Sequence, residues 1–496
     1  MSFNGWNLSA DGTWRKEMGG LQKVYRFQST IARATGREHW GLYCSCKVTC
    51  RGTLAHDIAI ELRDAWKALR VEFPALGLTI DGYDAVYHPA SKLEDEGHGN
   101  VDFLNQWAEE TFSVEHNRTV EDIVAQYPLN DLPTLFWFPQ SSELMILISH
   151  WRSDGLGCVM LLNRLLELLA EPAAVSRGQC YDVDEELAKI SPSLEDAAGA
   201  PSSPTPKILE TSSQMEKSFR ERAMKSMGIP FKGDTTSLPG NPAIDAIVYT
   251  PESSKDLFEA CKVRKITVSA AIHTALAQTL FDLSSTKNAT EYATTMAVNM
   301  RPYVQKPYDT SQHACCAYVT SITPTVQRGA GFNESAVSLT RMFRNWHSQE
   351  LSQALREVYQ SASRALLSPP PKLAGRPPNP PSGILHSNLG VVDRFLRTQL
   401  RNGEIQVSNF RFGVSMMTRQ MLLYPWSFRG ELNLSINYND AFYDGPSPRQ
   451  VLDGTQEKLE RGLGIKLERY SSTESRTGIF QTTLHFFKQL FHAFRS

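Results

Sequence analysis

His150 is the residue in this sequence whose type and setting are best suited to chemistry. It follows the apolar run 144–148 and precedes Asp154 and Gly155 in the stretch "SHWRSDG". The imidazole has an unperturbed pKa of about 6.5, so a histidine at the end of a strand can act as a general base near neutral pH. We expect such a base to take a proton from a hydroxyl or an amine that attacks an activated carbonyl.

The motifs that the sequence lacks limit the kinds of reaction that this base could assist. The sequence contains no GxSxG nucleophile elbow, no P-loop and no dinucleotide-binding glycine fingerprint. A single base without an enzyme nucleophile suits direct attack on a thioester, which is already activated. A helix beginning near Gly155 would also point its N-terminal amides at the same region, where they would stabilise a developing oxyanion.

Asp154 and the two nearby glycines admit more than one interpretation. Asp154 could orient His150, or it could form a buried ion pair that fixes the turn, and it is well placed to cap the following helix. Gly155 and Gly157 would keep side chains out of the space above the histidine. In the alternative without catalysis, His150 is a lone histidine in a tight turn and Asp154 only caps a helix.

The elements that must position these residues follow from hydrophobic periodicity. Residues 134–150 predict two strands separated by "PQSS", and apolar residues at helical spacing predict a helix from about Gly155. Upstream, residues 57–76 carry a helical pattern that Pro74 ends. The first half of the chain therefore mixes strands and helices around the candidate base.

The second half repeats this alternation. Residues 242–283 predict a strand followed by two helices, and "YATTMAVNMRPY" predicts a strand ending at Asn299 and Arg301. Alternation in both halves indicates an α/β fold of two lobes. Between them, "ISPSLEDAAGAPSSPTPK" is rich in Ser, Pro and Ala and predicts an exposed connection. We divide the chain into an N-terminal lobe (1–180), an inter-lobe linker (181–234), a C-terminal lobe (235–470) and an amphipathic tail (471–496).

Composition excludes several classes of protein. The 496 residues are 41% hydrophobic and 21% charged, with a formal net charge of −2, so no global field attracts nucleic acid or an anionic membrane. No signal-peptide pattern or membrane-spanning run is present, and eight cysteines in so long a chain do not indicate a disulfide framework. We therefore expect a cytoplasmic protein that acts as a monomer without a nucleic-acid partner. The amphipathic pattern of the tail (471–496) predicts a helix that docks onto the rest of the protein or onto an oligomer partner. The alternative is a helix that lies on a membrane surface.

The order of segments carries a resemblance to a known family. Residues 150–155, "HWRSDG", form an HxxxDG motif that resembles the signature of the CoA-dependent acyltransferase superfamily. That superfamily includes plant-type BAHD acyltransferases, nonribosomal condensation domains and fungal O-acetyltransferases of the trichothecene type. Other segments resemble it in the expected order, from about Gly41 to Leu463: "AWKALRVEFPAL", "KITVSAAIHTALAQTL", "MAVNMRPY", "HSNLG" and "LNLSINYNDAFYDG".

The resemblance implies two chloramphenicol-acetyltransferase-like lobes with a central tunnel. His150 would be the general base, Asp154 would pair with Arg301 of the second lobe, and Gly155 would support the site. The co-substrate would be an acyl-CoA such as acetyl-CoA, and the acceptor a small molecule. No metal and no permanently bound cofactor would be needed. The implied activity is an O-acyltransferase that moves an acyl group, most simply acetyl, to a hydroxyl of a specialised metabolite.

Two departures separate the sequence from branches of this superfamily. BAHD enzymes carry Asp-Phe-Gly-Trp-Gly near the end, whereas residues 411–415 read "RFGVS" and retain only the Phe-Gly pair. Condensation domains carry a second histidine before the catalytic one, where this sequence has Ser149. With no carrier-protein or adenylation segment in the sequence, we expect a free-standing enzyme closest to the fungal trichothecene type.

Three more residues are candidates for lining the acceptor pocket: Trp151, Asn388 and Phe412. For Trp151 the alternative is packing behind the turn. His273 falls within a helical apolar pattern, which predicts a packed histidine and not a catalytic one. Two rival functions stay open: the same fold repurposed for cyclisation or condensation of a polyketide or peptide without an acyl donor, and a binding protein without catalysis.

Overall fold

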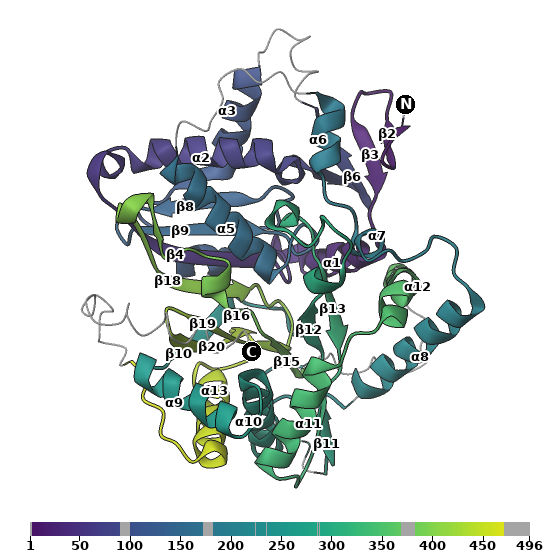
Figure 1. The fold of residues 1–496 in the computed structure, drawn as a ribbon, viewed down its shortest axis with the longest axis vertical. Helices are drawn as coiled ribbons and strands as arrows, with labels where there is room; N and C mark the ends of the chain where they lie inside the picture. Colours follow the sequence, from purple (N-terminus) through teal and green to yellow (C-terminus); the bar gives the residue numbers. More distant parts are fainter. Residues whose placement is uncertain are drawn as a thin grey trace.

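The chain folds into two lobes, each built on a large β-sheet (Figure 1). The computed structural model describes residues 2–89, 100–171, 182–368 and 382–470, apart from positions 224, 235, 285 and 287. Helices and strands alternate along these residues, and a buried apolar cluster fills each lobe. The fold is α/β, as the alternation of patterns predicts.

The sheet of the first lobe is covered on both faces. Its central strands β4 and β9 run antiparallel, with Leu42 opposite Ile148. The helices α2 (Ile58–Glu72) and α5 (Gly155–Ala170) pack together on one face, and α4 (Val120–Gln126) packs on the other. Coverage on both faces explains why β8 and β9 are nearly continuous apolar runs. Their spatial order is β17 (Gln399–Leu400), β18 (Ile405–Val414), β4 (Leu42–Cys50), β9 (Glu143–Ile148), β8 (Thr134–Phe138) and β7 (Phe112–Val114).

The sheet of the second lobe has seven strands, of which β19 and β20 are buried along almost their whole length. Helices α10 and α13 pack against each other beside this sheet, with α9 and α11 next to them (Figure 1). The strands follow the order β10 (Pro242–Val248), β20 (Glu431–Asn439), β19 (Met421–Phe428), β15 (Ile384–Ser387), β12 (Met296–Asn299) and β13 (Val319–Ile322), with β16 (Gly390–Val391) paired to β19. The helices are α9 (Pro251–Val263), α10 (Val268–Leu283), α11 (Phe332–Arg344) and α13 (Pro446–Leu463).

Smaller elements complete the structure. A third sheet contains β1 (Ser2–Phe3), β2 (Trp6–Leu8), β3 (Trp14–Glu17), β6 (Asp84–Tyr87) and β5 (Thr79–Asp81), and β11 (Glu291–Ala293) pairs with β14 (Thr325–Gln327). The remaining helices are α1 (Gly20–Thr30), α3 (Asn100–Thr111), α6 (Val183–Lys189), α7 (Leu194–Ala197), α8 (Pro206–Ala223) and α12 (Gln349–Leu367). Of these, α12 packs against both α1 and α8.

The segment expected as an exposed linker, 181–234, is largely helical. It contains α6, α7 and the long helix α8. Leu194 and Ala197 of α7 are buried, and the carboxylate of Glu195 accepts a hydrogen bond from the amide of Leu21 at 2.8 Å. The Ser, Pro and Ala content suggested exposure, but the few apolar residues within it pack against α1 and α12.

The expected lobe boundary at residue 235 does not separate the two sheets cleanly. β17 and β18 come from the C-terminal half of the chain, yet β18 pairs with β4 and completes the sheet of the first lobe. In Figure 1 the green β18 lies beside the purple β4. The late strands of the chain therefore contribute to both lobes, which no local pattern indicates. The expected tail, 471–496, lies outside the described residues.

No helix in the described part of the chain combines the length and apolar character needed to cross a bilayer. The seven cysteines among the described residues are free thiols. In the same part of the chain, no group of three or more His, Cys, Asp or Glu side chains is placed to hold a metal ion.

Candidate active site

The turn between β9 and α5 carries His150. It is closed by a hydrogen bond from the amide of Arg152 to the carbonyl of Ser149 at 3.0 Å. The guanidinium of Arg152 is buried and donates to the carbonyl oxygens of Leu78 at 2.6 Å and Asp131 at 2.7 Å. These bonds to backbone from other segments hold the turn rigidly against the first lobe.

The His150 ring is held in one tautomer. Its Nδ1 lies 3.0 Å from the carbonyl oxygen of Ser153. A carbonyl oxygen can only accept, so Nδ1 carries the hydrogen and the lone pair is on Nε2. Burial lowers the pKa of His150 below its ordinary value of 6.5, and bonds to the backbone and the charge of Asp154 offset part of this effect. The imidazole is therefore neutral at pH 7, with Nε2 ready to accept a proton.

Two aromatic rings flank this imidazole. The ring of Tyr25, from α1, is stacked on His150 with centroids 3.9 Å apart and planes 10° apart. The ring of Trp40 lies 6.4 Å from it. Trp40 has φ of 60°, a left-handed conformation that non-glycine residues seldom adopt. Neither residue could be predicted from the sequence, because both lie more than a hundred positions upstream and their spacing carries no signal.

Asp154 faces the second lobe and not the imidazole. Its oxygens lie 2.9 and 2.8 Å from Nη1 of Arg301, and both side chains are buried. Its carboxylate also accepts from the amides of Gly157 at 2.9 Å and Tyr318 at 2.7 Å. Of the roles open from the sequence, the geometry matches the ion pair together with the helix cap. His150 is oriented by the carbonyl of Ser153 instead.

The two glycines after Asp154 make room for neighbouring protein atoms. A Cβ at Gly155 would lie 2.6 Å from Cδ2 of Leu389, and one at Gly157 would lie 2.4 Å from the carbonyl oxygen of Ala314. The expectation that both glycines keep open space above the histidine is therefore wrong for Gly157. Its missing side chain lets α5 approach the second lobe closely.

A cavity between the lobes opens at His150. Strands of the second sheet form most of its wall, and the first lobe contributes the turn that carries His150 and the rings of Tyr25 and Trp40. Its lining residues are Tyr25, Trp40, His150, Asp154, Gly155, Leu156, Thr295, Ala297, Val298, Asn299, Val319, Ser321, Leu385, His386, Ser387, Asn388, Leu389, Val414, Leu422 and Tyr424.

Of the three residues expected to line the acceptor pocket, only Asn388 lines this cavity. Its amide donates to Oγ of Ser269 at 2.6 Å and its Oδ1 accepts from the amide of Gly390 at 2.6 Å, so it fixes the end of β15. Trp151 is buried in the first-lobe core behind the turn, with the Arg152 guanidinium 4.3 Å from its ring centroid. Phe412 is also buried, because it packs edge-on against Tyr424. For these two the pocket-lining expectation is wrong.

His273 is fully buried in α10, as the helical pattern predicts. Its Nδ1 lies 3.2 Å from Nδ1 of His386. Burial lowers the pKa of both rings, to about 4 for His386. The two form a neutral pair in the second-lobe core.

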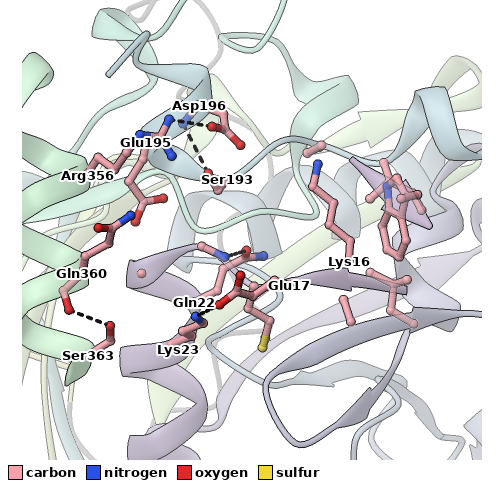
Figure 2. Close-up of a pocket in the computed structure, with 18 residues that line it drawn as sticks. Lys16, Glu17, Gln22, Lys23, Ser193, Glu195, Asp196, Arg356, Gln360 and Ser363 are labelled. Atoms are coloured by element: carbon pink, nitrogen blue, oxygen red, sulfur yellow. Dashed lines mark hydrogen bonds and ion pairs between the residues drawn. The ribbon is translucent and has the colours of Figure 1, made fainter. Parts of the chain in front are cut away.

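A second cavity lies at the N-terminus of α1 (Figure 2). Four of its charged side chains form two ion pairs: Arg356 bonds to Asp196 at 2.7 Å, and Lys23 bonds to Glu17. Glu195 also faces this cavity while it accepts the bond from the first turn of α1. These contacts anchor the helix that carries Tyr25.

The chain is similar to curated fungal proteins along most of its length. No protein-family model matches the sequence. The chain is 41% identical over 464 residues to "O-acetyltransferase pigM" of Monascus ruber, covering 93% of this chain and 88% of that protein. It is 36% identical over 452 residues to "Azaphilone biosynthesis cluster protein M" of Aspergillus terreus, covering 91% and 96%.

A solved structure shows the same fold. The trichothecene 15-O-acetyltransferase TRI3 of Fusarium sporotrichioides superposes with a TM-score of 0.71 at 17% identity, covering 92% of this chain and 96% of that one. Both lobes are included in this coverage, so the likeness extends to the whole two-lobed architecture. The chain is an acyltransferase and belongs to the fungal O-acetyltransferases of the HxxxDG superfamily.

Proposed function

We propose that the protein transfers an acetyl group from acetyl-CoA to a hydroxyl of a specialised metabolite, with His150 as the general base. The observation that carries this proposal is the His150 imidazole, whose Nδ1 is bonded to the Ser153 carbonyl while the ring lines the inter-lobe cavity. The names of the two relatives, an O-acetyltransferase and an azaphilone cluster protein, support the acetyl group and the class of acceptor.

The reaction begins when the acceptor hydroxyl donates to Nε2 of His150. As the proton moves to the imidazole, the oxygen attacks the thioester carbonyl and a tetrahedral oxyanion forms. The imidazolium is stabilised by the Ser153 carbonyl at Nδ1 and by the face of Tyr25. The C–S bond then breaks, the carbonyl re-forms as an ester, and His150 returns the proton to the departing sulfur of CoA.

The oxyanion needs donors that are fixed before the reaction starts. The first residues of α5, Gly155 and Leu156, line the cavity. The N-terminus of a helix carries a partial positive charge, which favours a developing negative charge there. The amide of Gly157 is engaged by Asp154, so we assign this role to the amides before it.

Direct transfer is favoured over an acyl-enzyme. Among the described residues, the hydrogen-bond partner of the His150 ring is the backbone carbonyl of Ser153, and not a serine hydroxyl or a cysteine thiol. The nearest buried thiol of the same segment is Cys158, and burial raises its pKa well above the ordinary value, so it stays protonated. Without an activated nucleophile, donor and acceptor must bind together, one through each mouth of the tunnel that this fold implies.

The proposal is tested by following thiol release and product mass with acetyl-CoA and hydroxylated azaphilones as acceptors. We expect thiol release that depends on both substrates, initial-rate patterns of a ternary complex, and a product heavier by one acetyl group. No acetylated enzyme should be seen in the intact mass. Conversion of an acceptor without any acyl donor would support the rival cyclisation reaction and would contradict the proposal.

A further inference from the structure

A buried carboxyl group lies beside the turn that carries His150. Glu38, in the segment leading to β4, is only 1% exposed. Its Oε2 lies 3.0 Å from Oγ of Ser149, the residue immediately before His150. Glu38 takes no part in the proton transfer proposed for His150.

The number of hydrogens available for hydrogen bonds around Glu38 favours a protonated, neutral carboxyl group. The hydroxyl of Ser149 lies within reach of two acceptors, Oε2 of Glu38 at 3.0 Å and the carbonyl oxygen of Asn130 at 3.4 Å. A hydroxyl has one hydrogen and can donate it to only one of them. If Glu38 is protonated, its O–H donates to Oγ of Ser149, and Ser149 donates onward to Asn130. An ionised Glu38 would take the Ser149 hydrogen and leave the Asn130 carbonyl without this donor.

The charged groups around Glu38 do not supply an ion-pair partner. Arg26 of α1 bonds to Asp131 at 2.8 Å, and Arg152 donates to the carbonyl of Asp131 at 2.7 Å. The Tyr127 hydroxyl interacts electrostatically with Glu38, but it donates its hydrogen to the Leu42 carbonyl oxygen at 2.6 Å. Oε1 of Glu38 has no hydrogen-bond partner among the described residues. Burial raises the pKa of Glu38 to about 8, and a serine hydrogen bond and the two arginines offset this only in part.

We propose that Glu38 is a positioning residue which, as a neutral acid, holds Ser149 and so fixes the turn that carries His150. When Glu38 loses its proton, the chain of hydrogen bonds through Ser149 to Asn130 is broken and an unpaired charge remains in the first lobe. The turn then moves, and the base with it. Trp40 lies two residues after Glu38 and packs near His150, so the imidazole is affected from a second side. This inference rests on the proposed role of His150 as base.

The pH dependence of kcat/KM tests the proposal on the whole enzyme. The wild-type enzyme should lose activity about tenfold for each pH unit above the ionisation of Glu38, because one proton is lost. Glu38→Gln should keep its activity at high pH, since the amide donates to Ser149 as the neutral acid does. The control is Glu186→Gln on α6, another buried carboxyl whose pKa burial raises. Glu186→Gln should lose kcat/KM at high pH in the same way as the wild-type enzyme. A Glu38→Gln profile that falls with the wild-type profile would overturn the proposal.

A second measurement does not depend on turnover. The folded protein keeps the Glu38 proton up to a pKa of about 8, whereas the unfolded chain releases it near the ordinary value of 4.5. The unfolded state therefore binds fewer protons between these values, and stability should fall as the pH rises. Glu38→Gln should lack this one-proton slope in thermal unfolding. An unchanged slope would show that Glu38 is ionised and would overturn the proposal. If the enzyme transfers no acetyl group at all, the proposed function fails while this slope still tests Glu38.

Discussion

The carboxylate of Asp154 and the guanidinium of Arg301 form a buried ion pair that joins the two lobes across 147 residues of sequence. The same carboxylate accepts from the backbone amides of Gly157 and Tyr318. One side chain thus fixes the start of α5, and with it the His150 turn, against the second lobe. In the proposed mechanism, Asp154 would hold the geometry in which His150 works as the base.

Removing either partner of this pair should destabilise the protein. Asp154→Ala leaves the Arg301 charge buried and unpaired, which typically costs about 3–5 kcal/mol. Thermal and denaturant unfolding should show this loss for each single variant and a less-than-additive loss for the double variant. As a control, Glu457→Gln removes an exposed pair with Arg461, for which we expect about 0–1 kcal/mol. Additive losses for Asp154 and Arg301 would argue against their coupling.

A methyl group at position 157 should disturb the contact between the lobes. Gly157→Ala places Cβ within 2.4 Å of the Ala314 carbonyl oxygen, a backbone atom that cannot rotate away. We expect a loss of about 1–3 kcal/mol in unfolding free energy, as for other overpacked sites, together with reduced kcat. Gly331→Ala, where a Cβ would meet nothing within 4 Å, should keep wild-type kcat and lose at most about 0.5–1 kcal/mol, because Gly331 is the N-cap of α11 and alanine caps a helix less well than glycine. Equal stability of the two variants would contradict this packing.

The acid limb of the pH–rate profile should report His150. The base acts in its neutral form, so kcat/KM falls when the pH drops through its pKa. Because burial lowers that pKa, the midpoint should lie below the ordinary value of 6.5. A midpoint above 6.5 would mean that another group, or an ionised neighbour, controls the rate.

We expect the face of the stacked Tyr25 ring, and not its hydroxyl, to contribute to kcat. Tyr25→Phe keeps the ring and should retain activity. Tyr25→Leu removes a contact to the imidazolium of about 0.5–2 kcal/mol and should lower kcat by about 2- to 30-fold. The Tyr303 and His347 rings are stacked in the same way at 3.7 Å, so Tyr303→Leu is a matched control that should leave kcat unchanged. A large loss in Tyr25→Phe would show that the hydroxyl acts instead.

Local patterns in the sequence predicted the part of the site that is continuous in the chain. The apolar run ending at Ile148, the polar turn and the helix capped by Asp154 follow from periodicity and capping preferences alone. The partnership of Asp154 with Arg301 came from the resemblance to the acyltransferase superfamily. Spacing within the chain contains nothing that pairs residues so far apart.

The walls of the cavity could not be predicted in the same way. Tyr25 and Trp40 reach His150 only because α1 and the segment before β4 pack against the first lobe, and Tyr424 comes from the second sheet. Trp151 lies within the HxxxDG motif and Phe412 within the late Phe-Gly pair, but backbone direction turns both side chains into the core. Which way a side chain points depends on the strand pairing, and the insertion of β18 beside β4 shows how non-local that pairing is.

In the proposed mechanism, the His150 imidazole removes the proton from the acceptor hydroxyl. This role is tested by measuring kcat of purified His150→Ala with saturating acetyl-CoA and acceptor, beside His116→Ala as the exposed-histidine control. Loss of a general base lowers the rate by about 10²- to 10⁴-fold, and this loss should occur with unchanged folding and unchanged binding of CoA. His116→Ala should turn over like the wild type. Wild-type turnover in His150→Ala would contradict the assignment of the base.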